Sequence, residues 1–205
     1  MPNTFNFSCQ CRTLKGTVEL PDMRSLTRLV CYCEDCQAYA RHLKPSEPVL
    51  GPHGGTDFVQ VSPAHFHIKR GMEKLGNLRL SESGLYRWHA TCCNTPLCNT
   101  PPNPSMPFVG LITNNLVCNQ STLANKVGPV RLGVCAGSQY PISADWPVAR
   151  NFGFKALTRT LLNIGRWRIA GDHTRSTLID AETGKPVIEP YTLNETERKE
   201  LYTTA

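Results

Sequence analysis

The stretch Cys31–Cys36 reads Cys-Tyr-Cys-Glu-Asp-Cys and places three thiols within six residues. Eight of the ten cysteines of the chain fall in three short clusters, at residues 9–11, 31–36 and 92–98. Packing of a protein core does not require thiols to gather in this way. Thiols one or two residues apart can reach the same metal ion, so the pattern indicates metal binding.

Length and composition describe an ordinary folded protein of 205 residues, 40% hydrophobic and 19% charged. The N-terminal sequence MPNTFNFSCQC has neither the basic region nor the apolar run of a signal peptide, so we expect a cytoplasmic protein. Cytosolic thiols are kept reduced, which favours metal ligands over disulfides. No stretch approaches 18 uninterrupted apolar residues, so no membrane partner is expected.

Short β-prone runs separated by turn signals predict a mainly β core. The expected strands are residues 17–20, 27–31, 58–61, 66–68, 75–80 and 85–89. The sequence QAYARHL after Cys36 is rich in helix formers and predicts one or two helical turns. In the last of the expected strands, alternation places one of Arg87 and Trp88 in the core and the other at the surface.

The sequence changes character at residues 100–107, where four of eight residues are proline. We therefore expect a β domain at residues 1–105 and a mixed α/β extension at residues 106–205. Apolar residues near helical spacing predict a helix within residues 152–167. Residues 177–188 predict a hairpin, and Asn194 with Glu197 three residues later predicts the start of a final helix.

The three thiols of the central stretch suit a zinc ion with an open position. Zn²⁺ bound by Cys31, Cys33 and Cys36 carries a net charge of −1, and three protein ligands with a free fourth position are typical of catalytic zinc. The soft ligand set favours an incoming sulfur over oxygen. Two alternatives remain open: His42 or a distant thiol closes the site, or Cys33 and Cys36 form a redox pair.

The outer clusters suit a second, closed zinc site. Cys9 and Cys11 share one face of an extended chain, and a distant thiol pair would complete four ligands while closing a loop of about 80 residues. We assign Cys92 and Cys93 to this site, which requires a turn at Asn94-Thr-Pro because neighbouring strand residues point apart. Cys98 or His89 is the alternative fourth ligand.

This cysteine order resembles the glutathione-dependent formaldehyde-activating enzyme family, which includes the centromere protein V-like proteins. The shared pattern is C-x-C, then C-x-C-x-x-C, then a strand L-x-R-x and a cysteine turn ending in T-P-L, over about residues 5–100. The resemblance implies an Mss4-like β fold with two zinc ions. It implies that Cys31, Cys33 and Cys36 hold the zinc used in glutathione and carbon–sulfur bond chemistry, while the outer pairs hold a structural zinc.

The chain departs from that family pattern in three places. Tyr32 stands where a histidine is common, Ala90 replaces the first cysteine of the last turn, and Asn94 replaces its glycine. The extension after residue 105 has no counterpart in the compact members. The function implied is that of a zinc-dependent carbon–sulfur lyase acting on adducts of a small thiol such as glutathione.

Three further residues are candidate substrate contacts. Gly54 and Gly55 could bind an anionic group through backbone N–H donors, although a plain turn into the next strand explains them as well. Arg87 lies close to the last cysteines and could line a substrate pocket. The sequence carries no indication of the oligomeric state.

The alternative function is a non-catalytic zinc module that binds protein or nucleic acid through its basic extension. Residues 150–175 contain several cations against the lone acid Asp172, and these are Arg150, Lys155, Arg159, Arg166, Arg168 and Arg175. A solvated helix face explains the same residues, because the net charge of +6 is modest and no nucleic-acid motif accompanies them. Nucleic acid is therefore not expected as a partner.

Overall fold

The computed structural model describes residues 3–20, 27–45, 47–51, 53–118, 120–128, 130, 132–134 and 154–203. The strands are β1 (Asn3–Ser8), β2 (Lys15–Leu20), β3 (Thr27–Cys31), β4 (Thr56–Val61), β5 (Phe66–Arg70), β6 (Leu75–Arg79), β7 (Tyr86–Ala90), β8 (Thr95–Thr100), β9 (Val109–Ile112), β10 (Leu132–Val134) and β11 (Tyr191–Thr192). The α-helices are α1 (Glu34–Leu43), α2 (Gln120–Val127), α3 (Phe154–Ile169) and α4 (Glu195–Thr203).

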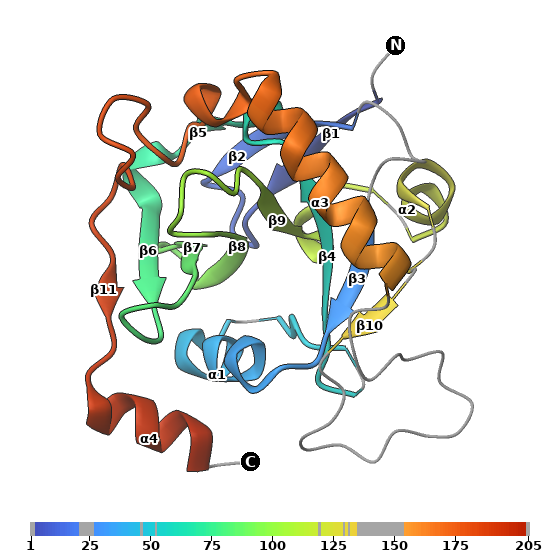
Figure 1. Ribbon diagram of the computed structural model, residues 1–205. Helices are drawn as coiled ribbons and strands as arrows, with labels where there is room; N and C mark the ends of the chain where they lie inside the picture. The colour runs from blue at the N-terminus through green and yellow to red at the C-terminus, as the bar shows by residue number, and fades with distance from the viewer. Residues whose placement is uncertain are drawn as a thin grey trace.

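The strands form two sheets (Figure 1). One is three-stranded with the order β1-β2-β5, and the other is eight-stranded with the order β10-β3-β4-β9-β8-β7-β6-β11. In the large sheet β10 and β11 run parallel to their neighbours β3 and β6, whereas the other strand pairs are antiparallel. The prediction of a mainly β fold is confirmed.

Strands from both predicted regions share the large sheet. Strand β9, which follows residue 105, lies between β4 and β8, and β10 and β11 extend the two edges. The predicted boundary at residue 105 lies between β8 and β9, which are adjacent strands of that sheet. The division into two domains stays a prediction, and the described strands on either side of it belong to one structural layer.

Burial alternates along β2 of the small sheet, whereas it is continuous along β8 at the centre of the large sheet. Along β2 the apolar side chains Val18 and Leu20 are buried, while the alternating residues Thr17 and Glu19 are only half-buried. In contrast, all six residues of β8 are buried. Trp88 of β7 is fully buried, and its indole N–H donates to Thr100 Oγ1 at 2.9 Å, which satisfies its one polar atom.

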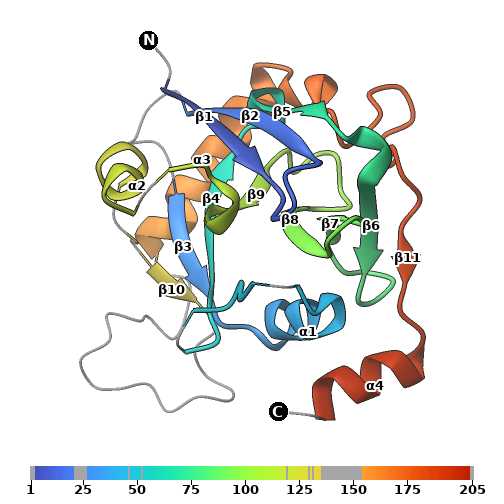
Figure 2. The same cartoon turned by 180° about the vertical axis from the view of Figure 1, so that it is seen from behind.

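Helix α1 begins at the central cysteines because Cys33 caps it. The Cys33 sulfur accepts from the N–H of Cys36, Glu34 and Asp35 occupy the first turn, and Lys44 ends the helix in the left-handed region. The helix is therefore longer than the one or two turns that the sequence predicts, since it already starts at Glu34. Seen from behind, α1 and the C-terminal α4 lie side by side below the large sheet (Figure 2).

Helices α3 and α4 confirm two further predictions. Asn194 and Glu197 form a reciprocal capping box at the start of α4, with bonds of 2.9 and 3.0 Å. Helix α3 faces the protein in part with polar side chains. Thr160, for example, is buried and donates to Gln60 Oε1 at 3.2 Å. Ile164 is also buried, but several other large apolar side chains of the helix are exposed, with Phe154 at 81%.

The hairpin predicted at residues 177–188 is present only as a single β-bridge between Ile179 and Pro186. A turn joins the two sides, since the N–H of Asp180 donates to the carbonyl of Lys185 and the Asp180 side chain accepts from Thr183. This segment has paired backbone without forming two strands.

Candidate metal centres

Two tight turns bring Cys9, Cys11, Cys92 and Cys93 together, and we call these residues the four-cysteine group. After β1 the chain turns back at Arg12, which has φ +60°, and the N–H of Cys9 donates to the carbonyl of Leu14 at 3.0 Å. Between β7 and β8 the chain turns at Asn94, which has φ +53°. The turn expected after Cys93 is present.

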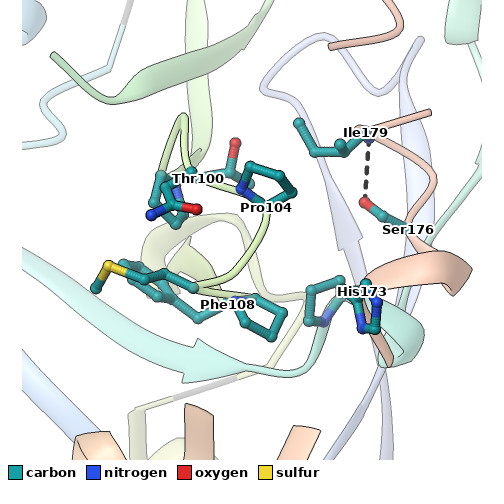
Figure 3. Close-up of a pocket in the computed structure, with 11 residues that line it drawn as sticks. Thr100, Pro104, Phe108, His173, Ser176 and Ile179 are labelled. Atoms are coloured by element: carbon teal, nitrogen blue, oxygen red, sulfur yellow. Dashed lines mark hydrogen bonds between the residues drawn. The ribbon is translucent and has the colours of Figure 1, made fainter. Parts of the chain in front are cut away.

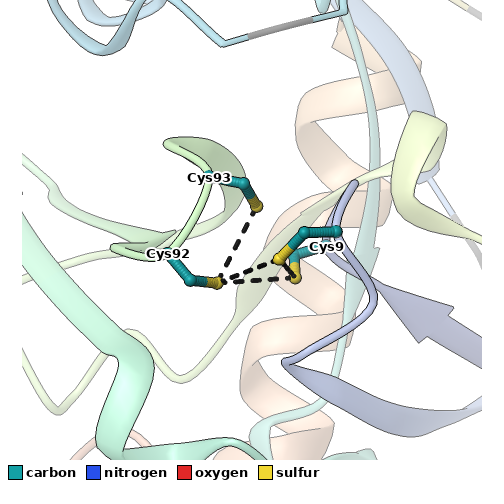
Figure 4. Close-up of side chains that lie close together, drawn as sticks. Cys9, Cys92 and Cys93 are labelled. Atoms are coloured by element: carbon teal, nitrogen blue, oxygen red, sulfur yellow. Dashed lines mark hydrogen bonds between the residues drawn. The ribbon is translucent and has the colours of Figure 1, made fainter.

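The two turns are fastened to one another by backbone and sulfur contacts. The N–H of Gln10 donates to Thr95 Oγ1 at 3.0 Å. Figure 4 shows the sulfurs of Cys92, Cys93 and Cys9 converging on one point. The Sγ–Sγ distances are 3.3 Å from Cys11 to Cys92, 3.5 Å from Cys9 to Cys11, and 3.9 Å from Cys92 to both Cys9 and Cys93.

These distances fit a single tetrahedral ion. Zinc–sulfur bonds of about 2.3 Å place the sulfurs of a tetrahedral site about 3.8 Å apart. All four sulfurs lie within 4.8 Å of one another, so the group could hold a metal ion. Within the described ranges, neither Cys98 nor His89 joins this group: Cys98 is fully buried in the core and His89 packs against Gly76.

Cys31, Cys33 and Cys36, which we call the trio, come from the end of β3 and the first turn of α1. The sulfurs of Cys31 and Cys33 are 3.3 Å apart, and all three lie within 4.8 Å of one another. Cys36 is buried, whereas Cys31 and Cys33 are half-buried, so the trio lies at the edge of the core. Its three soft donors also fit a metal ion.

Hydrogen bonding within the trio shifts the pKa values of Cys31 and Cys33 in opposite directions. Hydrogen bonds from Cys31 and Cys36 lower the pKa of the Cys33 thiol to about 2, and the backbone N–H of Cys36 acts in the same direction. The hydrogen bond to Cys33 raises the pKa of Cys31. Hydrogen bonding therefore favours negative charge on the Cys33 sulfur over the Cys31 sulfur.

No fourth ligand closes the trio among the residues that the structure describes, whether histidine, cysteine, aspartate or glutamate. His42, the predicted alternative, is a half-buried residue of α1 and lies outside the group. The two clusters therefore differ in their number of ligands, with four thiols in one and three in the other.

Arg87 lies against the trio and is buried, as is its neighbour Trp88. The expectation that one of the two is at the surface is wrong. Arg87 and Trp88 point to opposite faces of β7, and both faces are covered: Trp88 belongs to the main core cluster, whereas Arg87 lies against Cys36 and Tyr39 of α1. Arg87 Nη1 lies 3.9 Å from Cys36 Sγ, and its side chain is 3% exposed. Sequence reasoning missed this contact, because Arg87 and Cys36 are 51 residues apart.

Gly54 and Gly55 form a tight turn beside the trio. Gly54 has φ +74°, and its N–H donates to the carbonyl of Gly51 at 2.9 Å. A Cβ on Gly55 would lie 2.5 Å from the ring of Tyr32, so only glycine allows this close approach. The turn packs against Tyr32, the residue between Cys31 and Cys33.

Two hollows in the surface lie outside the cysteine clusters. The one in Figure 3 is lined by Thr100, Pro104, Phe108 and His173 among others, and its volume of about 20 Å³ has room for little more than a water molecule. A larger cleft of about 680 Å³ lies between α1, α4 and the segment residues Pro45, Pro48, Val49 and Leu50. Its wall residue Val49 packs against the cluster that contains Cys36.

The basic extension is only partly a free cationic face. Arg166 and Arg168 are exposed and Arg159 is half-buried, but Arg175 is paired with the buried Asp172. Arg150 and the side chain of Lys155 lie outside the described residues. None of the helices in the described ranges combines the length and the apolar character needed to cross a bilayer.

Comparison with known proteins places the chain in one family. A crystal structure of a Rhodobacter sphaeroides protein matches with 19% identity and a TM-score of 0.41, over 61% of this chain and 96% of that protein. No curated protein matches. Residues 1–190 match a family of unknown function, DUF6151. The chain belongs to this family of unknown function, DUF6151.

Proposed function

We propose that this protein is a zinc protein with two centres of different kinds, one structural and one that binds a thiol. The four-cysteine group is the structural centre, because four thiolates fill the coordination of tetrahedral zinc. The trio is the thiol-binding centre, because three thiolates leave one position for an outside ligand. The observation that carries the proposal is this difference in ligand number between two clusters of one chain.

Zinc is the metal that suits both clusters best. Thiolate ligands are soft and select zinc, copper(I) or iron–sulfur clusters over magnesium, calcium and manganese. The sulfur spacing of 3.3 to 3.9 Å in the four-cysteine group supports a mononuclear tetrahedral ion. Mononuclear tetrahedral thiolate sites are characteristic of zinc.

The activity proposed is that of a carbon–sulfur lyase on adducts of a small thiol such as glutathione. This follows the resemblance of the cysteine order to the glutathione-dependent formaldehyde-activating family, whose Mss4-like fold we propose for the β core. When bound, zinc would hold the substrate sulfur as a thiolate. We propose that the rest of the substrate lies in the cleft beside α1, whose wall carries Arg41 and Lys44 together with Glu200 and whose Val49 packs in the same cluster as Cys36.

Cobalt substitution tests the proposal, because Co²⁺ reports its ligands in the visible spectrum. We expect two metal ions per chain and a spectral change on addition of millimolar glutathione. The change should persist in a C11S/C92S variant and vanish in C33S, whose serine still caps α1. A cobalt spectrum that glutathione leaves unchanged would refute the thiol-binding centre. If C33S keeps the spectral response to glutathione, that response does not come from the trio, and the assignment of the thiol-binding centre is wrong.

The exposed face of α3 favours a second candidate function, a module that binds a partner protein. Large apolar side chains are exposed there, with Leu162 at 68% and Ile169 at 90%, beside the exposed Arg166 and Arg168. Contiguous exposed apolar side chains often mark interaction sites. In that case both metal ions are structural and glutathione changes neither, so the cobalt experiment separates the two functions.

A further inference from the structure

Arg87 is a buried cation placed directly against the trio. It projects from β7, and its Nη1 is 3.9 Å from the sulfur of Cys36. Its Nη2 is 3.6 Å from a carboxylate oxygen of Asp35, and its Cζ lies 5.2 Å from the ring centroid of Tyr39. The aromatic face and the carboxylate hold the guanidinium in one orientation, with one nitrogen toward the trio.

Asp35 compensates the charge of Arg87 only in part. A buried charge is costly unless it is paired, and the Arg87 side chain is 3% exposed. The Asp35 side chain is 49% exposed and also accepts a hydrogen bond from the Tyr202 hydroxyl of α4, so water and a second donor share its charge. Among the described residues, the sulfurs of the trio lie beside the guanidinium, and as thiolates on a metal ion they would be its remaining anionic partners.

Charge counting shows what the guanidinium adds to the centre. A divalent zinc ion with three thiolates has a net charge of −1, and Arg87 brings the sum to zero. An anionic fourth ligand would then give −1 in total, instead of −2 without the arginine. A neutral fourth ligand leaves the sum unchanged, so the arginine favours anions over neutral ligands.

We propose that Arg87 is the internal counter-cation of the trio and makes its open position select an anionic ligand, such as a thiolate, over a neutral one. The inference rests on the proposed function and assigns to Arg87 a positioning and selecting role from inside the protein. When a thiol binds as thiolate its proton passes to solvent, so the selected species is the anion.

The test compares an anionic with a neutral ligand on the cobalt-loaded full chain. The probes are 2-mercaptoethanol, which binds as a thiolate, and imidazole, which binds uncharged. The variants are R87Q, which removes the charge, and R87K, which keeps it. R79Q is the matched control, because Arg79 also stacks on a tyrosine but lies outside both cysteine groups.

The readout is the ratio of the two apparent dissociation constants. We expect R87Q to weaken thiolate binding relative to imidazole by about a hundredfold, the effect of a unit charge about 6 Å away at an effective dielectric constant of about 20. R87K should stay within about tenfold of the parent, and R79Q should match it. An unchanged ratio in R87Q, or an equal loss of both ligands, would overturn the inference.

If R87Q cannot be loaded with cobalt, the amount of metal bound by R87K and by R87Q tests the inference instead. Uptake by R87K but not by R87Q supports a need for positive charge, whereas failure of both variants overturns the inference in favour of a role for the arginine's shape. The proposed function fails separately, when the parent protein itself responds to neither ligand. If the parent protein and R87Q bind the thiol equally well, only the inference about Arg87 is refuted and the proposed function stands.

Discussion

The four-cysteine group predicts a large stability loss when its metal link is cut. Cys11 and Cys92 are both exposed, so the double variant C11S/C92S removes two of the four sulfurs with little change in packing. The two residues left, Cys9 and Cys93, are too few to hold a structural zinc. We therefore expect this variant to bind one metal ion instead of two.

The size of the loss follows from the loop that the metal closes. Cys11 and Cys92 are separated by 81 residues. If a metal link acts on the unfolded chain as a disulfide does, closing a loop of about 80 residues removes about 4.5 kcal/mol of chain entropy at 25 °C. We expect the double variant to lose about 3 to 5 kcal/mol of unfolding free energy.

Urea unfolding with metal analysis is the assay. The parent protein after removal of its metal should unfold with the same free energy as the metal-depleted double variant, because both have lost the same link. C118S is the control, since Cys118 is a half-buried thiol outside both groups, and it should change the unfolding free energy by less than about 1 kcal/mol. A double variant that keeps two metal ions, or loses less than about 1 kcal/mol, would refute the reasoning.

Three further predictions concern the trio and the C-terminal helix. The variant C33S should lose one metal ion while the four-cysteine group keeps its own, as metal analysis and the retained stability to urea will show. The metal affinity of the trio should rise with pH through the neutral range, because hydrogen bonding raises the pKa of Cys31 and metal binding must displace its proton. Competition with a chelator at several pH values measures this affinity. An affinity that falls as the pH rises would contradict the prediction. Replacing Asn194 by alanine should cost about 1 kcal/mol, since it removes the cap of α4, and should speed amide exchange in that helix but not in α1.

Local sequence signals predicted much of the fold, because they depend on neighbouring residues only. The strand expected at residues 27–31 is β3 with the same bounds, and the capping pattern of Asn194 and Glu197 starts α4 as expected. Strand β8 escaped prediction. Its residues Thr95–Thr100 are buried on both faces and include Pro96, so they show neither alternation nor strong β-propensity.

Of the candidate site, the sequence predicted the cysteine ligands but not the residues that surround them. Spacing alone grouped Cys9 with Cys11 and united the trio, whereas the choice of Cys92 and Cys93 needed the turn at Asn94. The contact between Arg87 and Cys36 depends on how β7 packs against α1, which no local pattern contains. The helical spacing within α3 predicted the helix but not its buried face, because Thr160 is buried through a hydrogen bond to Gln60.

The proposed function depends on two clusters that bind metal ions with different numbers of protein ligands. Cadmium-113 NMR of the cadmium-loaded chain tests this directly, because the chemical shift follows the number of sulfur ligands. We predict two separate resonances, of which only one moves when glutathione is added. Two resonances that both indicate four sulfur ligands and stay in place with glutathione would contradict the proposal.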